Sequence, residues 1–392
     1  MPNTGLTGHA DRQRSYTADI LVGTSTVDVG VDFHINLLIF EASDAGTFLQ
    51  RLGRLGRHTS YTDRDGNPHT FHAFAAYALV PPFIFERLFA AQMPQQSPLL
   101  TDGATLTREV LGQHIRTAYP PFAQFQHYAS HWGRFQAAKV YATLSTRDAR
   151  ETFATVRQNL KQRYSTLLEA SVPKAMHEWD NRIKVGEQLL IDEAQSFRGG
   201  SPFDCAVLQQ DESGADEVVT YDLFMLLANF QLAWMSQSEF VVAVEQIGIN
   251  SRPYKRTPPR HVAYFRRLKL LDTFQDVTVV LPPHIAAWGT ERFQTAQVLP
   301  GLELHCLGHD WLIELNELLG HTNVVALLIG GHHPVDLRRR LRLPGTFRLH
   351  QYRFADEGQV DGSIVFGREA LLLDSRLRYT KLETPGGGAY LV

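Results

Sequence analysis

Three arginines recur at three-residue spacing in the string Q-R-L-G-R-L-G-R-H, residues 50–58. A guanidinium group binds phosphate oxygens in pairs, so arginines beside small residues suit a polyphosphate ligand. In a helical or near-helical segment, Arg51, Arg54 and Arg57 share a face. The two glycines of the string would each cost a helix about 1 kcal/mol, and packing gives no reason for that cost. This string therefore predicts a polyphosphate-binding site rather than a solvated basic face.

A second string, I-L-V-G-T-S-T-V-D-V-G-V-D-F, occupies residues 20–33. It reads as a short strand that ends at a small polar turn. Thr24 and Ser25 offer hydroxyl and backbone N–H groups to a phosphate, and Gly30 lets a ligand approach the backbone closely. Asp32 can accept hydrogen bonds from a ribose or orient an arginine. An ordinary strand-to-helix turn remains the alternative for this string.

Taken in this order, the two strings resemble motifs five and six of superfamily-two helicases. They are most similar to the CRISPR-associated DNA helicase of type I-D systems, over residues 18–58. The resemblance implies a partial second RecA-like lobe, and ATP as ligand. It makes Arg54 and Arg57 the catalytic arginine fingers that stabilise charge on the transferring γ-phosphoryl group.

The same resemblance assigns the remaining residues of the two strings. Gln50 would help to hold motif six against the nucleotide, and Gly30 and Asp32 would face the ribose. Thr24, with Ser25 beside it, would contact a phosphate of the tracking DNA strand. Both ATP and Mg²⁺ would be held mainly by a first lobe.

The elements that must position these residues predict an α/β fold. Residues 20–22, 37–40 and 71–80 read as strands, and Ser43 or Asp44 can cap a helix that runs through Phe48, Leu49 and Leu52. A strand–helix–strand order without hairpin turns implies a parallel sheet. Further on, the pattern is helical over residues 83–184, with one apolar face over residues 153–168. After residue 186, β-like runs appear at 240–244, 277–281, 324–329 and 363–366.

These patterns predict three regions. Residues 1–92 form the partial second RecA-like lobe with its parallel sheet, residues 93–186 a helical region, and residues 187–392 an α+β accessory domain.

The phosphate loop of a first lobe, G-x-x-x-x-G-K-[S/T], is not found, because the sequence contains no Gly-Lys pair. The string L-L-I-D-E-A-Q at residues 189–195 imitates the Mg²⁺-binding motif two, but it follows motif six instead of preceding it. We therefore expect Asp192 and Glu193 to begin a turn rather than bind a metal. The expectation is a truncated reading frame or half of a split enzyme, inactive toward ATP alone.

Residues 251–270 contain seven cations and no acidic residue, in a chain of net charge −3. Cations for the backbone and rings for the bases are what a single-strand groove uses, and Tyr254, Tyr264 and Phe265 are interleaved. The predicted nucleic-acid contacts here are Arg252, Lys255, Arg256, Arg260, Arg266 and Arg267. A weaker basic cluster spans residues 338–348.

Metal, disulfide and membrane chemistry are not expected. His305, Cys306 and His309 match no closed zinc spacing. Two cysteines in 392 residues indicate a reducing cytoplasm. No apolar run reaches the roughly 18 residues of a membrane span.

The sequence thus predicts the carboxy-terminal part of an ATP-dependent CRISPR helicase. Its expected partners are single- or double-stranded DNA, the missing amino-terminal lobe, the interference complex and a separate nuclease subunit. Two alternatives stay open. One is another superfamily-two helicase that acts on RNA or in DNA repair. The other is a non-enzymatic DNA-binding or interaction module derived from a helicase.

Overall fold

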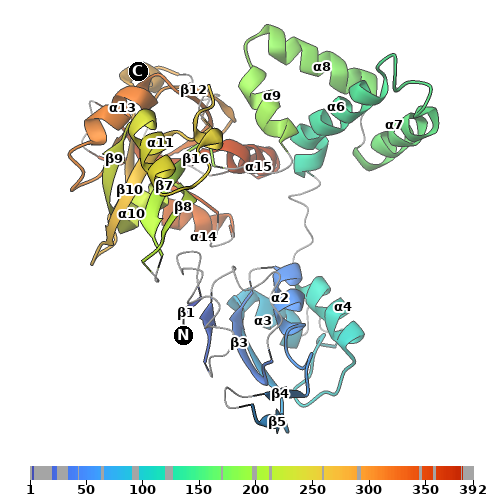
Figure 1. Cartoon of the computed structure of the whole chain (residues 1–392). Helices are drawn as coiled ribbons and strands as arrows, with labels where there is room; N and C mark the ends of the chain where they lie inside the picture. Colours follow the sequence, from blue (N-terminus) through green and yellow to red (C-terminus); the bar gives the residue numbers. More distant parts are fainter. Residues whose placement is uncertain are drawn as a thin grey trace. The chain divides into compact units, whose positions relative to one another are not determined.

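A computed structural model of the chain shows two compact units, residues 1–122 with 210–215, and residues 123–209 with 216–392 (Figure 1). The residues that it describes are 2–3, 20–23, 34–42, 44–62, 66–90, 97–119, 127–168, 171–196, 201–211, 214–257, 260–288, 293–343, 347–355, 359–380 and 382. The α/β class predicted from the sequence is confirmed. The functional division into lobe, helical region and accessory domain stays a prediction.

In its described residues, the first unit combines short strands with the helices α2 (Ala45–Leu52), α3 (Pro82–Phe89) and α4 (Arg108–Ala118). Its strands are β1 (Pro2–Asn3), β2 (Val22–Gly23), β3 (Leu37–Glu41), β4 (Ser60–Thr62), β5 (Pro68–Thr70) and β6 (Ala75–Leu79).

Strands β3 and β6 form the sheet that carries this unit. They pair in parallel, with Leu37 opposite Ala75 and Glu41 opposite Leu79, as the strand–helix–strand order predicts. The connection contains α2, whose first turn is capped by the Asp44 carboxylate accepting from the Thr47 N–H at 2.9 Å. The predicted cap at Asp44 is confirmed.

Only one face of the β3–β6 sheet is packed against helices. Phe40 and Phe48 are buried there with Ile84 of α3 and Ile115 of α4. The other face is apolar and exposed, and it carries Leu37, Ile39, Tyr77 and Leu79, each more than half accessible. Parallel sheets in proteins are ordinarily covered on both faces. The described residues of this unit leave the second face open.

The second unit begins with a helical segment and continues as two sheets. The segment consists of the π-helical turn η2 (Ala129–Gly133), α6 (Arg134–Leu144), α7 (Ala154–Leu168), α8 (Val172–Lys184) and α9 (Gln188–Gln195). The four-stranded sheet has the order β8 (Asp216–Asp222), β7 (Asp204–Gln210), β10 (Ala263–Leu270), β9 (Phe230–Met235).

The six-stranded sheet has the order β12 (Gln297–Pro300), β14 (Asn323–Gly330), β16 (Gly362–Phe366), β15 (His350–Phe354), β11 (Thr278–Leu281), β13 (Glu303–His305). The other helices that the structure describes in this unit are α10 (Leu223–Asn229), α11 (Gln237–Gln246), η3 (Arg252–Tyr254), α12 (Pro283–Ala286), α13 (Leu312–Gly320), α14 (Pro334–Arg340) and α15 (Gly367–Leu377).

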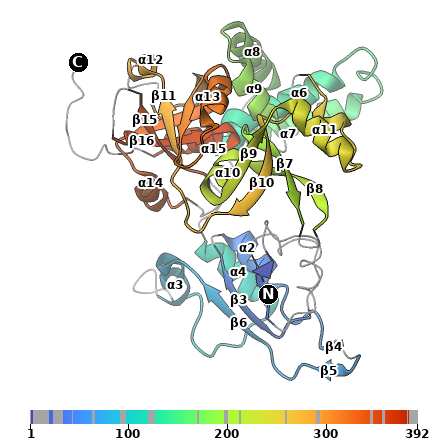
Figure 2. The same ribbon diagram turned by 60° about the vertical axis from the view of Figure 1, so that its left-hand side comes forward.

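Alternating side chains of β14 divide the core of the second unit into two layers. Ala326 and Leu328 belong to the core that is shared with the four-stranded sheet, and Val325 and Leu327 belong to the core that includes residues of α9 and α15. Figure 2 shows α15 beside β16, the neighbour of β14 in this sheet. Because successive strand residues point to opposite faces, a continuous apolar run marks a strand that is covered on both sides. The strand predictions at 324–329 and 363–366 are confirmed.

A buried carboxylate ties the helical segment to the six-stranded sheet. Asp374 of α15 is 1% exposed and accepts from Trp132 Nε1 at 2.8 Å and from the Ala296 N–H at 3.1 Å. Its other neighbours are His131 and Arg378, each at 3.4 Å. Burial opposes the charged form, but these partners outweigh it and lower the pKa of Asp374.

Two local predictions are wrong. Residues 240–244 belong to helix α11, whose first turn is held by a capping box between Ser236 and Glu239. Asp192 and Glu193 lie inside α9 rather than at the start of a turn. The helix expected over residues 153–168 is present as α7. Phe153 and Val156 on its apolar face are exposed, whereas Tyr164 is buried.

Candidate functional site

The arginine string begins in α2 and ends in the turn that follows it. Helix α2 stops at Leu52 with Gly53 as its C-cap. The Arg54 N–H donates to the Arg51 carbonyl at 2.9 Å, so the chain tightens into three-residue turns. Gly56 then takes a φ of +69°, a left-handed conformation that favours glycine. Gly56, for which packing gave no reason in the sequence, is therefore needed for the backbone conformation of this turn.

Arginine side chains fasten the turn to its surroundings. Arg51 Nη1 donates to the Glu41 carbonyl at 2.7 Å, which links α2 to the end of β3. Arg57 Nε donates to the Gly53 carbonyl at 2.9 Å. From α4, Arg108 Nη2 donates to the Leu55 carbonyl at 2.8 Å. The Arg57 bond satisfies the carbonyl of the C-cap residue Gly53, one of the groups that a helix end leaves without an intrahelical partner.

Burial anchors the same turn and leaves part of it accessible. Leu55 is 8% exposed and Phe48 is 7% exposed, so both hold the backbone against the core. Arg54 is half-buried, whereas Gln50 and Arg57 are exposed. The structure thus brings Gln50, Arg54 and Arg57 together on one short, well-fixed segment. Their roles toward ATP stay predictions.

The other half of the predicted nucleotide site lies outside the described residues. This applies to Thr24, Ser25, Gly30 and Asp32.

A histidine pair that the sequence did not reveal joins the two ends of this region. The rings of His34 and His58 stack at a centroid distance of 4.0 Å. His34 Nδ1 also lies 3.1 Å from the Ser60 carbonyl. His34 comes directly after the string of residues 20–33, and His58 ends the arginine string of residues 50–58. Single histidines carry no pairing signal in one sequence, so only the tertiary structure brings them together.

The predicted nucleic-acid residues of 251–270 are mostly exposed, but their interleaved rings are not. Arg252, Lys255, Arg256, Arg260 and Arg266 are exposed, and Arg267 is half-buried with its guanidinium 5.3 Å from the Phe230 ring centroid. Tyr264 is 5% exposed and Phe265 is fully buried. These two rings therefore cannot stack on bases, and that part of the prediction is wrong.

Two of the basic side chains are engaged in ion pairs within the chain. Lys255 pairs with Glu245 of α11 and lowers the pKa of that carboxyl, together with a hydrogen bond from Ser251. In the second basic cluster, Arg348 pairs with Asp222 at 3.0 Å and with Glu369 at 3.4 Å. Arg348 thus has a structural role that the sequence did not indicate.

The candidate metal ligands do not assemble into a site. Among the residues that the structure describes, no group of three or more His, Cys, Asp or Glu side chains could hold a metal ion. Asp192 accepts from the Gln188 amide at 2.6 Å, and burial raises the pKa of Glu193. Cys306 lies 3.2 Å from Gln275 Oε1, and burial raises its pKa.

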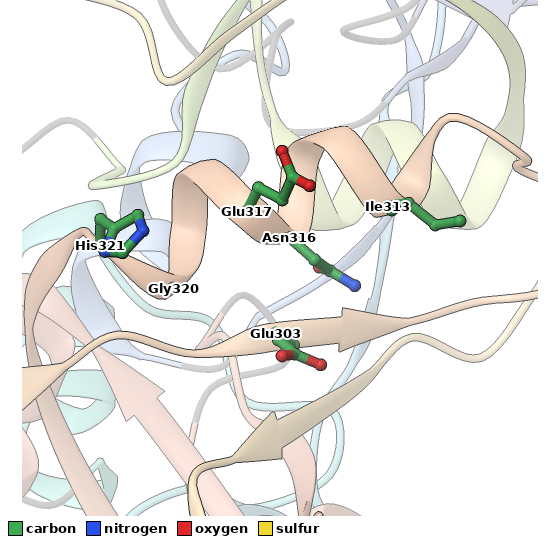
Figure 3. A pocket seen from close by; sticks show the side chains of 6 residues that line it. All are labelled: Glu303, Ile313, Asn316, Glu317, Gly320 and His321. Carbon is green, nitrogen blue, oxygen red and sulfur yellow. The ribbon is translucent and has the colours of Figure 1, made fainter.

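Two cavities of the second unit are lined by none of the residues predicted to contact ATP and by none of residues 251–270. One, of about 400 Å³, lies between β13 and α13, and Figure 3 shows Asn316 reaching from the helix toward the strand that carries Glu303. The other, of about 510 Å³, lies where β14 ends, beside His332, His333 and Arg339. Separately, no helix in the described part of the chain has the length and apolar character to cross a bilayer.

Comparison with known proteins gives one match. Residues 4–60 match the family model described as "CRISPR-associated nuclease/helicase Cas3, C-terminal". Neither the curated proteins nor the solved structures give a match. The matched stretch contains both strings singled out above and ends just after the arginine turn. The match supports a Cas3-type helicase C-terminal region over this part of the chain.

Proposed function

We propose that this chain is the carboxy-terminal part of an ATP-dependent DNA helicase of CRISPR interference, of the type I-D kind. Within it, Arg54 and Arg57 contact the γ-phosphoryl group of ATP bound by a separate first lobe. The observation that carries the proposal is the family match over residues 4–60, which includes the arginine turn. The proposed partners are DNA, the interference complex and a separate nuclease subunit.

The geometry of the turn fits contact with a polyphosphate. Arg57 is exposed at the point where the chain leaves α2, and Arg54 is half-buried one turn earlier. Their backbone is fixed by Arg51, Arg108 and the buried Leu55. A fixed backbone preorganises the guanidinium groups, which raises their effect on charge that develops in a transition state. To bind a phosphate, Arg57 Nε gives up its hydrogen bond to the Gly53 carbonyl and donates to the ligand instead.

The chain needs a second polypeptide segment for this reaction. Its sequence has no Gly-Lys pair for a phosphate loop, and the described residues offer no carboxylate cluster for Mg²⁺. In this proposal, the phosphate loop and the metal ligands belong to the separate first lobe that binds ATP. The open apolar face of the β3–β6 sheet is in keeping with a unit that is covered by further structure.

The test is DNA-stimulated ATP hydrolysis by the chain with and without a first lobe. We expect no hydrolysis by the chain alone. In the reconstituted enzyme, Arg57→Ala should reduce kcat by about 10³-fold or more, the scale of an arginine finger, with DNA affinity nearly unchanged. Arg57→Lys should rescue little, because an ammonium cannot bind phosphate in a planar fork.

Lys161→Ala, an exposed cation of α7, is the matched control and should hydrolyse ATP normally. Hydrolysis by the chain alone would contradict the proposal. So would an equal loss of hydrolysis and DNA binding in Arg57→Ala.

One observation favours the non-enzymatic alternative, in which the arginines hold the fold. Arg51 and Arg57 donate to backbone carbonyls of their own unit. If that is their whole role, Arg57→Ala should lower the free energy of unfolding by about 1–3 kcal/mol and leave hydrolysis by the reconstituted enzyme intact.

A further inference from the structure

The end of strand β10 presents cations and large apolar side chains to solvent together. Its first three residues are buried, whereas Arg266, Leu268, Lys269 and Leu270 are exposed. Leu268 is 53% accessible and Leu270 is 61% accessible. β7 pairs with β10 only as far as Arg266, and beyond it the described ladder continues with β9 alone. The outer half of β10 therefore belongs to a two-stranded ribbon (Figure 1).

A β-bulge in this ribbon places two of the cations on one face. Arg267 lies opposite Leu232 and Lys269 opposite Gln231, so Leu268 is the extra residue between them. A bulge shifts the alternation of side chains by one position. Lys269 therefore falls on the same face as Arg266, whereas regular alternation would put it on the opposite face.

The sheet face that carries Arg266 and Lys269 extends toward the cations of residues 252–260, which precede β10. Tyr264 lies on it and packs against Phe240 of α11 and Tyr254 of η3. The Gln237 amide of α11 donates to the carbonyls of Tyr254 and Arg256, which holds the basic loop beside the same face. Residues 246–271 contain no acidic residue. Arg266, Lys269 and the basic loop thus lie on one side of the four-stranded sheet, where Glu245 of α11 pairs with Lys255, whereas Arg267 lies on the other side.

Exposed apolar groups accompany these cations. Besides Leu268 in the bulge, Phe274 lies four residues past the strand and is 72% accessible. The segment after β10 is held in place, because the Leu271 N–H donates to the Asn229 carbonyl at 2.7 Å and the Gln275 N–H to the Ala228 carbonyl at 3.0 Å. Asp272 and Asp276 are the carboxylates of this segment. Large apolar side chains next to cations suit a polyanion that also exposes apolar surface.

We propose that this ribbon binds single-stranded nucleic acid: Arg266 and Lys269 contact phosphates, and Leu268 and Phe274 contact unstacked bases. A single strand exposes its phosphates and the apolar faces of its bases at once, whereas a duplex stacks its bases inside. The biological meaning rests on the proposed helicase function, but the binding itself requires no ATP. The competing ligand is an acidic protein surface, which would also be attracted to these cations.

The test measures the affinity of the full chain for a fluorescent oligothymidylate over a range of salt concentrations. Arg266→Gln with Lys269→Gln should weaken binding and reduce the slope of log affinity against log salt by about 1.4, since each phosphate contact on a single strand contributes about 0.7. Lys161→Gln with Arg163→Gln, two exposed cations of α7, is the charge-matched control and should bind as the unchanged chain does.

Base contact is tested separately from phosphate contact. Leu268→Ser with Phe274→Ser should weaken binding about tenfold, the scale of one lost stacking contact, without changing the salt slope. In Phe274→Trp, the added oligonucleotide should quench the new indole fluorescence. Both ribbon substitutions lie on exposed side chains, so a normal unfolding curve is expected for each.

Three results would overturn the inference. The first is that the chain does not bind the oligonucleotide. The second is that the Arg266/Lys269 variant keeps the affinity and the salt slope of the unchanged chain. The third is that polyglutamate displaces the oligonucleotide and that the oligonucleotide does not quench the indole fluorescence of Phe274→Trp. The last would assign the surface to an acidic protein. A failure of the helicase proposal appears elsewhere, as normal hydrolysis by the reconstituted Arg57→Ala enzyme.

Discussion

At the scale of single residues, His350 shows how burial sets a charge state. Its ring stacks on Phe224 at 3.7 Å at the start of β15. Burial lowers the pKa of His350 from 6.5 to about 4; nearby Arg348 and Arg338 act in the same direction, and Asp222 opposes them. The ring is therefore neutral in the folded chain at neutral pH.

This shift predicts a loss of stability in acid. Between pH 6.5 and about 4 the unfolded chain binds a proton at this position that the folded chain does not, so the free energy of unfolding falls as pH falls. By pH 5 the loss from this group should be about 2 kcal/mol. His350→Phe keeps the ring and removes the titration, so urea unfolding at pH 7 and pH 5 should differ less than in the unchanged chain. His321→Phe, at an exposed position, is the control, and an equal pH response in the two variants would contradict the assignment.

At the scale of elements, α13 closes the open edge of the six-stranded sheet. β13 is the last strand of that sheet. The Leu304 N–H donates to Asn316 Oδ1 at 2.8 Å, and Asn316 Nδ2 donates to the Leu304 carbonyl at 2.9 Å. The carboxamide thus takes the place of a peptide group of a neighbouring strand. An uncovered edge would be a template for pairing with another chain.

Asn316→Leu should therefore expose the edge. We expect a loss of about 1–3 kcal/mol in the free energy of unfolding, because two backbone groups lose their partners. Sedimentation velocity should also show self-association that grows with concentration. Glu314→Leu adds the same side chain to an exposed position of α13 without touching Leu304. Association by Glu314→Leu to the same extent would attribute the effect to surface hydrophobicity instead.

At the scale of the whole molecule, the two units have separate cores. The core of the first unit includes Ile84, which is fully buried against α2 and α4 residues. The second unit has larger cores, one of which includes Leu371 of α15. Chains of this kind often unfold in more than one step, because each core is a cooperative unit of its own.

Scanning calorimetry should accordingly resolve two transitions. Ile84→Ala and Leu371→Ala should each cost about 2–5 kcal/mol in their own unit. Each substitution should move one transition to lower temperature and leave the other in place. A common shift of both transitions by either variant would show that the chain unfolds as a single cooperative unit.

The sequence by itself determined those features whose signal is local. The Asp44 cap, the parallel order of β3 and β6, and the doubly buried runs of β14 and β16 all follow from neighbouring residues. The strings of residues 20–33 and 50–58 are of this kind too, since both fall inside the family match at residues 4–60. A helix cap, the alternation of a strand and a sequence motif each depend on only a few neighbouring residues.

The tertiary structure decided what depends on partners far along the chain. Val241 and Val242 favour a strand locally, yet the Ser236 cap and the burial of Phe240 and Val244 on one side make a helix. The sequence predicted that Phe265 contacts bases, but its ring is buried in the core between the two sheets. The bulge at Leu268 decides which face Lys269 occupies, because a register depends on both strands of a pair. Side-chain exposure is a property of the assembled layers, and no short stretch of sequence contains it.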